Sequence, residues 1–282
     1  MVINKKSLDK FISLAIKEDL GSGDHTSLAC ISPLQTGRAQ LLVKQNGIIA
    51  GIDVAEIIFK KFDHFIKFEK VLDDGHKVNK GDIVFFVEGK AISILQAERL
   101  VLNIMQRMSG IATQTNTYVE KIKGFKTKIL DTRKTTPGMR LLDKYAVKIG
   151  GGENHRIGLF DMILIKDNHI DYAGGIENAL EKTHSYLKEH NKNLKIEIEA
   201  RSFEDIKRIL KYGGIDRILL DNFTPEQTRE AVQIIAGRVE IESSGNITLE
   251  NIRDYAACGV DYISIGALTH QIKSLDLSLK AF

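Results

Sequence analysis

Residues 194–221 read LKIEIEARSFEDIKRILKYGGIDRILLD and predict a strand, a helix and a second strand in succession. Residues 218–220 in the run 216–221 are continuously apolar, which is typical of a parallel strand buried on both faces. The residues between the two strands place apolar side chains at helical spacing. Both strands end in acids, Glu199 and Asp221. The stretch therefore predicts one repeat of an α/β protein.

The same pattern continues on both sides of this stretch. The last four strands start about 22 residues apart, which is the length of one short β–loop–α unit. The expected strands are 127–131, 161–166, 194–199, 216–221, 238–242 and 261–265, with helices at 176–187, 203–210, 225–236 and 249–257. Six strands fall short of an eight-stranded barrel, so either two strands are hidden, for example in 135–160, or the barrel is smaller or incomplete.

The N-terminal part has a different pattern. Short strands punctuated by turns indicate a compact α+β unit with antiparallel character. We expect strands near 39–43, 48–52, 65–72 and 83–87, and helices at 5–20, 54–62 and 91–122. Gly110 lies inside the last helix and is expected to break or bend it.

Composition excludes several classes of protein. A formal charge of +3 is too small to indicate nucleic-acid binding by itself, and aromatic residues make up only 7%. No apolar stretch approaches the roughly 20 residues of a membrane span. Two cysteines build neither a disulfide framework nor a cysteine zinc site. The start, MVINKKSLDKF, lacks the apolar core of a secretion signal, so a cytoplasmic protein is expected.

Cations follow several of the predicted strands, at the end where α/β barrels hold their catalytic groups. Arg133 and Lys134 come directly after a buried strand, in a loop shaped by Pro137 and Gly138. The run 150–156 is GGGENHR, and Lys166 ends the next strand. Arginine binds carboxylate or phosphate in a bidentate manner, and lysine acts as a movable point charge. We therefore expect an anionic substrate rather than a solvated basic turn.

Acids lie at the same end of the predicted sheet. Glu197 and Glu199 share a face, because strand side chains alternate with period two. An inward carboxylate must be paired or must hold a metal. Magnesium takes few carboxylates together with substrate phosphate oxygens. The acids therefore predict either a Mg-phosphate site or an internal salt-bridge network.

Small residues end the last two strands, at 243–246 and 265–267, and helices are expected to follow. Backbone amides and a helix N-terminus there suit a phosphate. Neither GxxxxGK[ST] nor GxGxxG occurs, which removes support for nucleoside triphosphate and dinucleotide binding.

With these motifs assembled, the chain resembles the quinolinate phosphoribosyltransferase family of type II phosphoribosyltransferases. The similarity runs through nearly the whole chain in order. The matching stretches are Gly23–Thr26, Ala97–Arg99, Leu102-Asn103, Ser109–Thr113, Asp131–Arg140, Lys144–Val147, Gly150–Arg156, Ile165–His169, Leu219–Phe223, Glu242–Gly245 and Gly266–His270.

The resemblance implies an N-terminal α/β sandwich domain and an incomplete, open α/β barrel domain, which accounts for six strands. The implied division is a sandwich at 1–112, a barrel at 113–270, and a C-terminal segment at 271–282 that packs on the sandwich. It also implies a homodimer or higher oligomer in which Arg99 reaches the neighbouring subunit's site. The implied substrates are quinolinate and phosphoribosyl pyrophosphate, with Mg²⁺ as cofactor.

The resemblance also assigns roles to the motif residues. Lys134, Glu199 and Asp221 are the expected catalytic groups, and the two acids are the expected Mg²⁺ ligands. The expected substrate-binding residues are Arg99, Thr132, Arg133, Lys134, His155, Arg156, Lys166, Glu199, Asp221, Ser243, Ser244, Gly245, Ile265, Gly266 and Ala267. Among them, Arg133, His155, Arg156 and Lys166 are expected at the quinolinate carboxylates, and the small residues at the ribose 5-phosphate.

Other functions are weighed against this one. A type II phosphoribosyltransferase for nicotinate or a related acid is the nearest, but one carboxylate needs fewer cations. A type I enzyme expects adjacent acids after the strand, and Asp131 stands alone. A barrel aldolase would use Lys166 as a Schiff base, in surroundings that are instead cationic. A nucleic-acid-binding protein would need a contiguous basic stripe with exposed aromatic residues.

Overall fold

The computed structural model describes residues 5–282; residues 1–4, the start of the segment that was inspected for a secretion signal, lie outside the described part. The chain forms two compact units. Unit 1 comprises the residues up to Asn116, Thr135–Gly151 and Ala267–Phe282, and unit 2 comprises Thr117–Lys134 and Gly152–Gly266. The predicted boundaries after residues 112 and 270 stay predictions.

Unit 1 is built around a four-stranded antiparallel sheet in the order β12-β1-β5-β3, with a separate pair β2-β4. Its elements are α1 (Lys5–Leu20), α2 (His25–Cys30), β1 (Thr36–Val43), β2 (Gly47–Ile48), α3 (Ile52–Phe62), β3 (Lys67–Lys70), β4 (Lys77–Val78), β5 (Ile83–Lys90), most of α4 (Ala91–Lys121), α5 (Arg140–Ile149), α11 (Ala267–His270) and β12 (Leu277–Ala281). The antiparallel α+β character expected from the sequence is confirmed.

Aromatic side chains join α3 to this sheet. The ring centroid of Phe59 on α3 lies 6.0 Å from that of Phe85 on β5 and 6.0 Å from that of Phe68 on β3. Phe59 and Phe85 are fully buried. The burial of large aromatic side chains is a major source of folding free energy, so this contact anchors the helix on the sheet.

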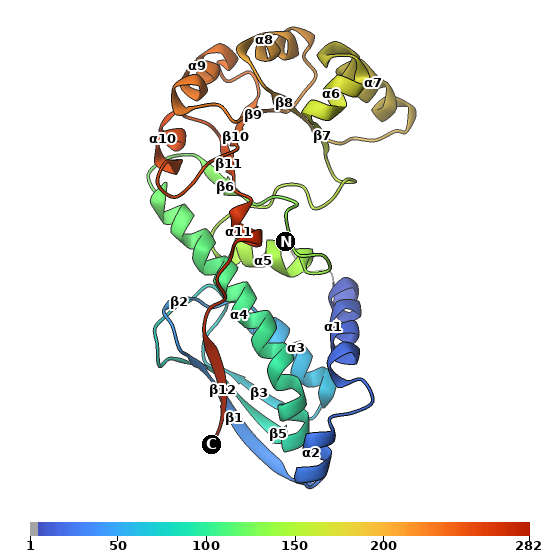
Figure 1. The fold of residues 1–282 in the computed structure, drawn as a ribbon, viewed down its shortest axis with the longest axis vertical. Helices are drawn as coiled ribbons and strands as arrows, with labels where there is room; N and C mark the ends of the chain where they lie inside the picture. Colours follow the sequence, from blue (N-terminus) through green and yellow to red (C-terminus); the bar gives the residue numbers. More distant parts are fainter. Residues whose placement is uncertain (1–4) are drawn as a thin grey trace. The chain divides into compact units, whose positions relative to one another are not determined.

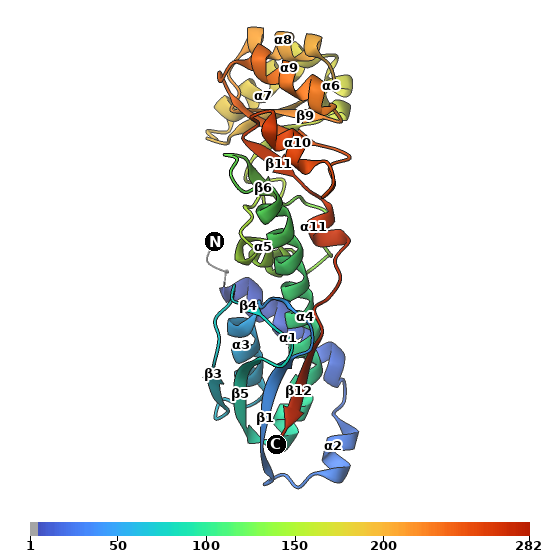
Figure 2. The same ribbon diagram turned by 90° about the vertical axis from the view of Figure 1, so that its left-hand side faces the viewer.

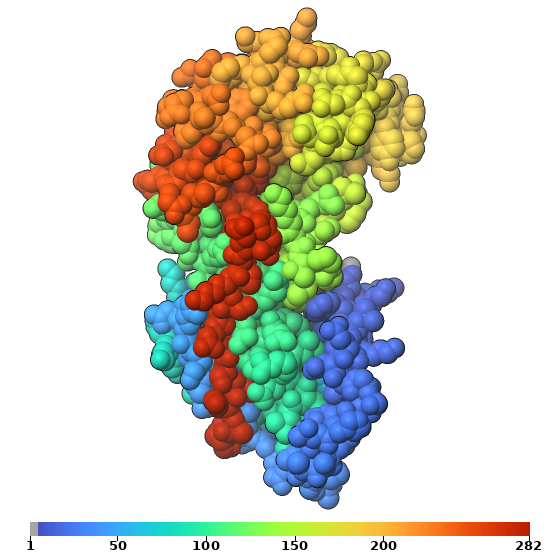
Figure 3. Space-filling view, in the orientation of Figure 1, coloured from blue at the N-terminus to red at the C-terminus, as the bar shows by residue number. Residues whose placement is uncertain are grey.

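The C-terminal segment runs along α4 and completes the sheet, as Figures 2 and 3 show in red. β12 pairs with β1 from Ala39↔Ala281 to Val43↔Leu277. Of the break or bend expected at Gly110, the break is wrong, because α4 continues through this residue, and the bend stays a prediction. A Cβ at Gly110 would lie 2.4 Å from the carbonyl oxygen of Lys273. The glycine therefore permits close packing of the C-terminal segment on the helix.

Unit 2 is an open α/β barrel whose six parallel strands lie in the order β6-β11-β10-β9-β8-β7. Helices lie along the outer side of the arc of strands, as Figure 1 shows. Its elements are β6 (Lys128–Leu130), β7 (Ile163–Ile165), α6 (Asp167–Ala173), α7 (Ile176–Glu189), β8 (Ile196–Ala200), α8 (Phe203–Tyr212), β9 (Arg217–Asp221), α9 (Pro225–Ile235), β10 (Glu240–Ser244), α10 (Ile252–Ala257) and β11 (Tyr262–Ser264). β6 and β7 are not paired with each other, so the expected incomplete barrel is confirmed.

The outer face of this sheet is apolar. Ile198, Ile218 and Ile241 pair in register across β8, β9 and β10, and each is at most 3% exposed. Capping fixes the adjacent helices: Thr224 accepts from the backbone N–H of Gln227, and Pro225 occupies the first turn of α9. None of the described helices has the length and apolarity needed to cross a membrane.

Candidate active site

The face of β8–β10 opposite the isoleucines is charged. Glu197, Arg217 and Glu240 form one row across the three strands, because the register pairs Arg217 with both acids. Two residues further along, Glu199 and Glu242 both pair with Leu219. Barrel interiors are ordinarily filled by branched apolar side chains. A charged interior is therefore a specific feature of this chain.

The predicted acids Glu199 and Asp221 lie at the carboxyl ends of β8 and β9. Glu199 accepts from Lys166 Nζ at 2.6 Å and from the backbone N–H of Asp167 at 2.9 Å. Burial and the charge of Glu199 raise the pKa of Asp221 above its ordinary value. Two carboxylates that repel each other, with one lysine beside them, suit a divalent cation bound through carboxylate and phosphate oxygens.

Among the predicted cations, Arg156 lies near both Arg133 and Glu199. Arg133 and Lys134 are exposed, and the backbone N–H of Lys134 donates to Thr132 Oγ1 at 3.0 Å, which fixes the start of the loop. Burial and the neighbouring charge of Arg133 lower the pKa of Arg156. Two guanidinium groups that destabilise each other's charge form a site at which an anion is bound favourably.

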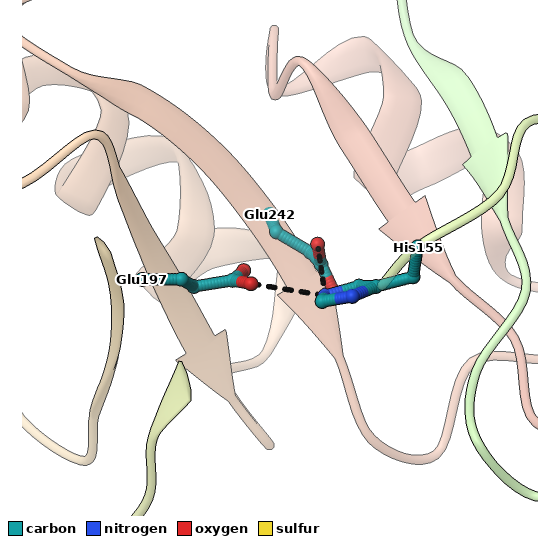
Figure 4. A group of neighbouring side chains, drawn as sticks. All are labelled: His155, Glu197 and Glu242. Atoms are coloured by element: carbon teal, nitrogen blue, oxygen red, sulfur yellow. Dashed lines mark ion pairs between the residues drawn. The ribbon is translucent and has the colours of Figure 1, made fainter. Parts of the chain in front are cut away.

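The side chain of His155 is buried in the interior of the barrel, next to two carboxylates. Its Nε2 atom lies 2.9 Å from Glu197 Oε2 and 3.4 Å from Glu242 Oε2, and the three side chains converge from the loop, β8 and β10 in Figure 4. The side chain of His155 is 6% exposed, and those of Glu197 and Glu242 are 0% and 1% exposed. For Glu197, the salt-bridge alternative is the one that the structure shows.

Arg217 completes this cluster of four charged side chains. Its Nη1 atom donates to Glu242 Oε2 at 2.9 Å, and Nη2 donates to Glu240 Oε2 at 3.2 Å. The guanidinium also lies 4.0 Å from the ring centroid of Tyr262. Neither Arg217 nor the side chain of Glu242 was among the residues expected at the active site. One sequence feature could have predicted this contact. Arg217 begins the predicted strand before three apolar residues, and Glu197 lies on the preceding predicted strand.

The protonation of His155 follows from its two ring contacts. Burial lowers the pKa of the imidazole, but Glu197 and Glu242 outweigh it and raise this pKa to about 9. Nδ1 lies 2.7 Å from the backbone nitrogen of Arg156, which favours an unprotonated Nδ1. The raised pKa favours the doubly protonated ring, whereas the Arg156 contact favours the neutral ring; in both states Nε2, the atom that faces the carboxylates, carries a proton.

The ligand atoms of His155, Glu197 and Glu242 lie within 4.8 Å of one another, the one such group of metal-ligating side chains among the described residues. Arg217 makes this cluster a poor metal site, because its guanidinium already supplies a cation to Glu242 and lies 3.9 Å from Glu197 Oε1. A divalent ion would leave the buried set with excess positive charge. Glu199 and Asp221 fit a metal better.

The small residues after β10 form a tight turn. Gly245 has φ +91°, and a Cβ there would lie 2.1 Å from Asn222 Oδ1, so only glycine fits. Ser243 shares the outer face with Leu220 and Ile263, so its side chain points away from the interior. The expected helix at 249–257 starts later, at Ile252. The phosphate site expected here therefore rests on backbone groups rather than on a helix N-terminus.

The structure brings most of the predicted site residues together in unit 2. Ile265 and Gly266 follow β11 there, and the backbone N–H of Ile265 donates to Leu130 O on β6 at 3.0 Å. Arg99 is exposed on α4 in unit 1, and Ala267 begins α11 in the same unit. The roles of these two residues stay predictions.

Fold and site together define a class: an open α/β-barrel enzyme with cations, acids and a glycine turn at its strand ends, arranged for a substrate with several negative charges. Two family models cover almost the whole chain. The quinolinate phosphoribosyl transferase N-terminal domain matches residues 24–109, and the C-terminal domain matches residues 111–280. The chain belongs to the quinolinate phosphoribosyltransferase family.

Individual relatives agree with this result. Quinolinate phosphoribosyltransferase [decarboxylating] 1 of Nicotiana glauca is 47% identical over 95% of this chain and 81% of its own. A probable nicotinate-nucleotide pyrophosphorylase [carboxylating] of Bacillus subtilis is 40% identical over 98% of this chain and 94% of its own. The crystal structure of NadC from Streptococcus pyogenes matches with a TM-score of 0.94 and 37% identity, covering 99% of this chain and 98% of that chain.

The expected cytoplasmic location is corrected by the same relatives. A Nicotiana glauca relative named mitochondrial and an Arabidopsis thaliana relative named chloroplastic are each 46% identical to this chain. Since such similar chains are named for organelles, composition and the lack of a secretion signal do not establish a cytoplasmic protein.

Proposed function

We propose that this chain transfers the phosphoribosyl group of phosphoribosyl pyrophosphate to quinolinate and releases pyrophosphate and carbon dioxide, giving nicotinate mononucleotide for NAD biosynthesis. Membership of the family over both of its domains carries this proposal. The cation pair Arg133 and Arg156 supports it, because two mutually destabilised guanidinium groups match a substrate with two carboxylates.

The proposed roles follow the charges of the site. Arg133 and Arg156 bind the carboxylates of quinolinate, and Lys134 and Lys166 face the pyrophosphate. Loss of pyrophosphate builds positive charge on the ribose, which Glu199 and Asp221 stabilise electrostatically. Thr132 holds the loop through its bond to the Lys134 N–H. The 5-phosphate is bound at Ser243, Ser244, Gly245, Ile265, Gly266 and Ala267.

Glu199 and Asp221 would hold Mg²⁺, whose chemistry there is to neutralise charge on the pyrophosphate oxygens. Lys166 already neutralises Glu199, so the negative charge of Asp221 is the one that a bound cation would stabilise most. The protein need only orient and partly desolvate the departing carboxylate. Loss of carbon dioxide leaves the electron pair on the ring carbon next to the cationic nitrogen, and this carbon then takes up a proton to give nicotinate mononucleotide.

We also propose a homodimer or higher oligomer in which Arg99 serves the partner's site. Its exposure on α4 supports this proposal. A mixed dimer of an Arg99→Ala chain and a Lys134→Ala chain should recover activity, because one of its two sites has both residues. Verified heterodimers with no recovered activity would exclude the shared site.

The activity is tested by incubating the protein with phosphoribosyl pyrophosphate, Mg²⁺ and either quinolinate or nicotinate. We expect nicotinate mononucleotide and carbon dioxide in equal amounts from quinolinate, and little product from nicotinate. Turnover of nicotinate without turnover of quinolinate would establish the alternative, a phosphoribosyltransferase for a monocarboxylate.

A further inference from the structure

The segment 153–156 lies at the open side of the barrel, where no strand joins β6 to β7. Its backbone pairs with β6: the backbone N–H of Glu153 donates to Ile129 O at 2.7 Å, and that of Asp131 donates to Glu153 O at 3.2 Å. These bonds fix the beginning of the segment. At the end of the segment, Arg156 Nη1 donates to Met162 O, directly before β7, at 3.4 Å.

The side chain of His155 crosses the interior from this segment. It forms ion pairs with Glu197 on β8 and Glu242 on β10, two strands that lie away from the open edge formed by β6. On the other side of the ring, the backbone N–H of Arg156 donates to Nδ1 at 2.7 Å. Asp131 accepts from the backbone N–H of His155 at 2.9 Å and holds the segment from the β6 side.

We propose that His155 is a positioning residue rather than a ligand of the substrate: with Glu197, Glu242 and Arg217 it ties the segment 153–156 across the open side of the barrel, and so orients Arg156 toward a carboxylate of the substrate. This inference rests on the proposed function for the identity of the substrate. It assigns roles to three buried charged residues, Glu197, Arg217 and Glu242, that the reaction itself does not use.

The charges of the cluster explain why this tie is rigid. Arg217 neutralises Glu242, and His155 Nε2 lies within ion-pair distance of both Glu242 and Glu197. Buried ion pairs depend on good geometry, since each displaced group loses its partner in a poorly solvating interior. A displacement of 1 Å in a substrate-binding group costs about 100-fold in activity, so a fixed segment is needed for the cation it carries.

The test compares the KM values for quinolinate and for phosphoribosyl pyrophosphate in His155→Gln, Glu197→Gln and the double variant. Each single variant should raise the KM for quinolinate about tenfold, with the KM for phosphoribosyl pyrophosphate changed less than about twofold. The double variant should be no worse than either single one, because both changes break the same tie. Glu242→Gln should act in the same direction.

Glu240→Gln is the matched control. This acid also bonds to Arg217 and lies on β10, but it has no ion pair with His155. Its KM for quinolinate should match that of the wild type. A direct ligand role for His155 predicts instead that His155→Gln alone raises this KM, or that the two changes multiply to about 100-fold; either result would overturn the proposal.

A second readout separates this inference from the proposed function. This readout is the free energy of unfolding of the wild type, His155→Gln, Glu197→Gln and the double variant, and its measurement requires no substrate. The double variant should again be no worse than either single variant. Additive effects of the two changes on unfolding would overturn the positioning role of His155, whichever pyridine carboxylate is the substrate. Absence of turnover with quinolinate in the wild type would instead remove the proposed function and leave the unfolding result intact.

Discussion

The antiparallel sheet of unit 1 and the parallel sheet of unit 2 fill their buried faces in different ways. In unit 1 the face against α3 is packed with the aromatic rings of Phe59, Phe68 and Phe85. In unit 2 the interior face carries Glu197 and Arg217, while the apolar contacts lie on the opposite face under the helices. The outer face of the barrel thus supplies hydrophobic stabilisation, which leaves the inner face free to organise charge.

The largest effect is expected from Arg217, which is 8% exposed and neutralises two acids of the interior. Arg217→Met removes the guanidinium that neutralises the buried Glu242, so the free energy of unfolding should fall by about 3–5 kcal/mol. Urea unfolding measures it. The control is Arg238→Met, whose guanidinium bonds to carbonyls at the end of α9 and is exposed, with an expected change within about 1 kcal/mol. A similar small change for both variants would refute a charge-organised interior.

Lys134 tests the opposite case, a charge that serves the reaction and not the fold. Lys134→Ala should lower kcat by about 100-fold, because a group that stabilises the leaving-group charge is lost. The melting temperature should stay close to that of the wild type, since Lys134 is exposed. Lys207→Ala, at an exposed position on α8, provides the control with normal turnover. A loss below tenfold in Lys134→Ala would argue against its assignment to the pyrophosphate.

Asp74 in unit 1 is a half-buried carboxyl with one buried, unpaired oxygen, and it gives the smallest expected effect. Oδ1 accepts from the backbone N–H of Ile52, whereas Oδ2 is buried with no hydrogen-bond partner among the described residues. Burial raises the pKa of Asp74 from 3.8 to about 6. The folded state therefore favours the protonated acid and loses stability as the pH rises from 3.8 through 6.

Asp74→Asn keeps the acceptor and removes this charge. It should increase the free energy of unfolding by about 1–3 kcal/mol at pH 7.5, and the gain should disappear below pH 4. Urea unfolding at the two pH values measures the difference. An asparagine variant that is less stable than the wild type at pH 7.5 would show that the ionised carboxylate is stabilised by contacts other than the Ile52 bond.

Local sequence was sufficient for the six strands of unit 2 and for the order of the chemical groups along them, but it missed β4 and β12 of unit 1. The run at 216–221 forms β9 from Arg217 to Asp221, because an apolar stretch that ends at an acid marks both the strand and its carboxyl end. The helix expected at 225–236 likewise begins at Pro225 as α9. Sequence alone left the missing strands open, and the resemblance to a family resolved them.

Contacts between distant residues were beyond local patterns. His155 lies in an irregular segment, so no periodicity indicated that its ring would face Glu197 and Glu242. The need for glycine at position 110 could not be predicted either, because it comes from the close approach of the Lys273 backbone and not from the helix itself. The outward direction of Ser243 could have been predicted, because neighbouring side chains on a strand point to opposite faces and Glu242 faces the interior.

Neighbouring residues on β8 offer the most direct test of the division between the two faces of the barrel. Glu197 faces the charged interior, and Ile198 faces the helices with no exposed surface. The measurement is the KM for quinolinate of Glu197→Gln and of Ile198→Val, the latter chosen because it costs only about 0.5–1.5 kcal/mol of stability. We predict a rise of about tenfold for Glu197→Gln and less than about twofold for Ile198→Val. Equal KM values for the two variants would contradict the account.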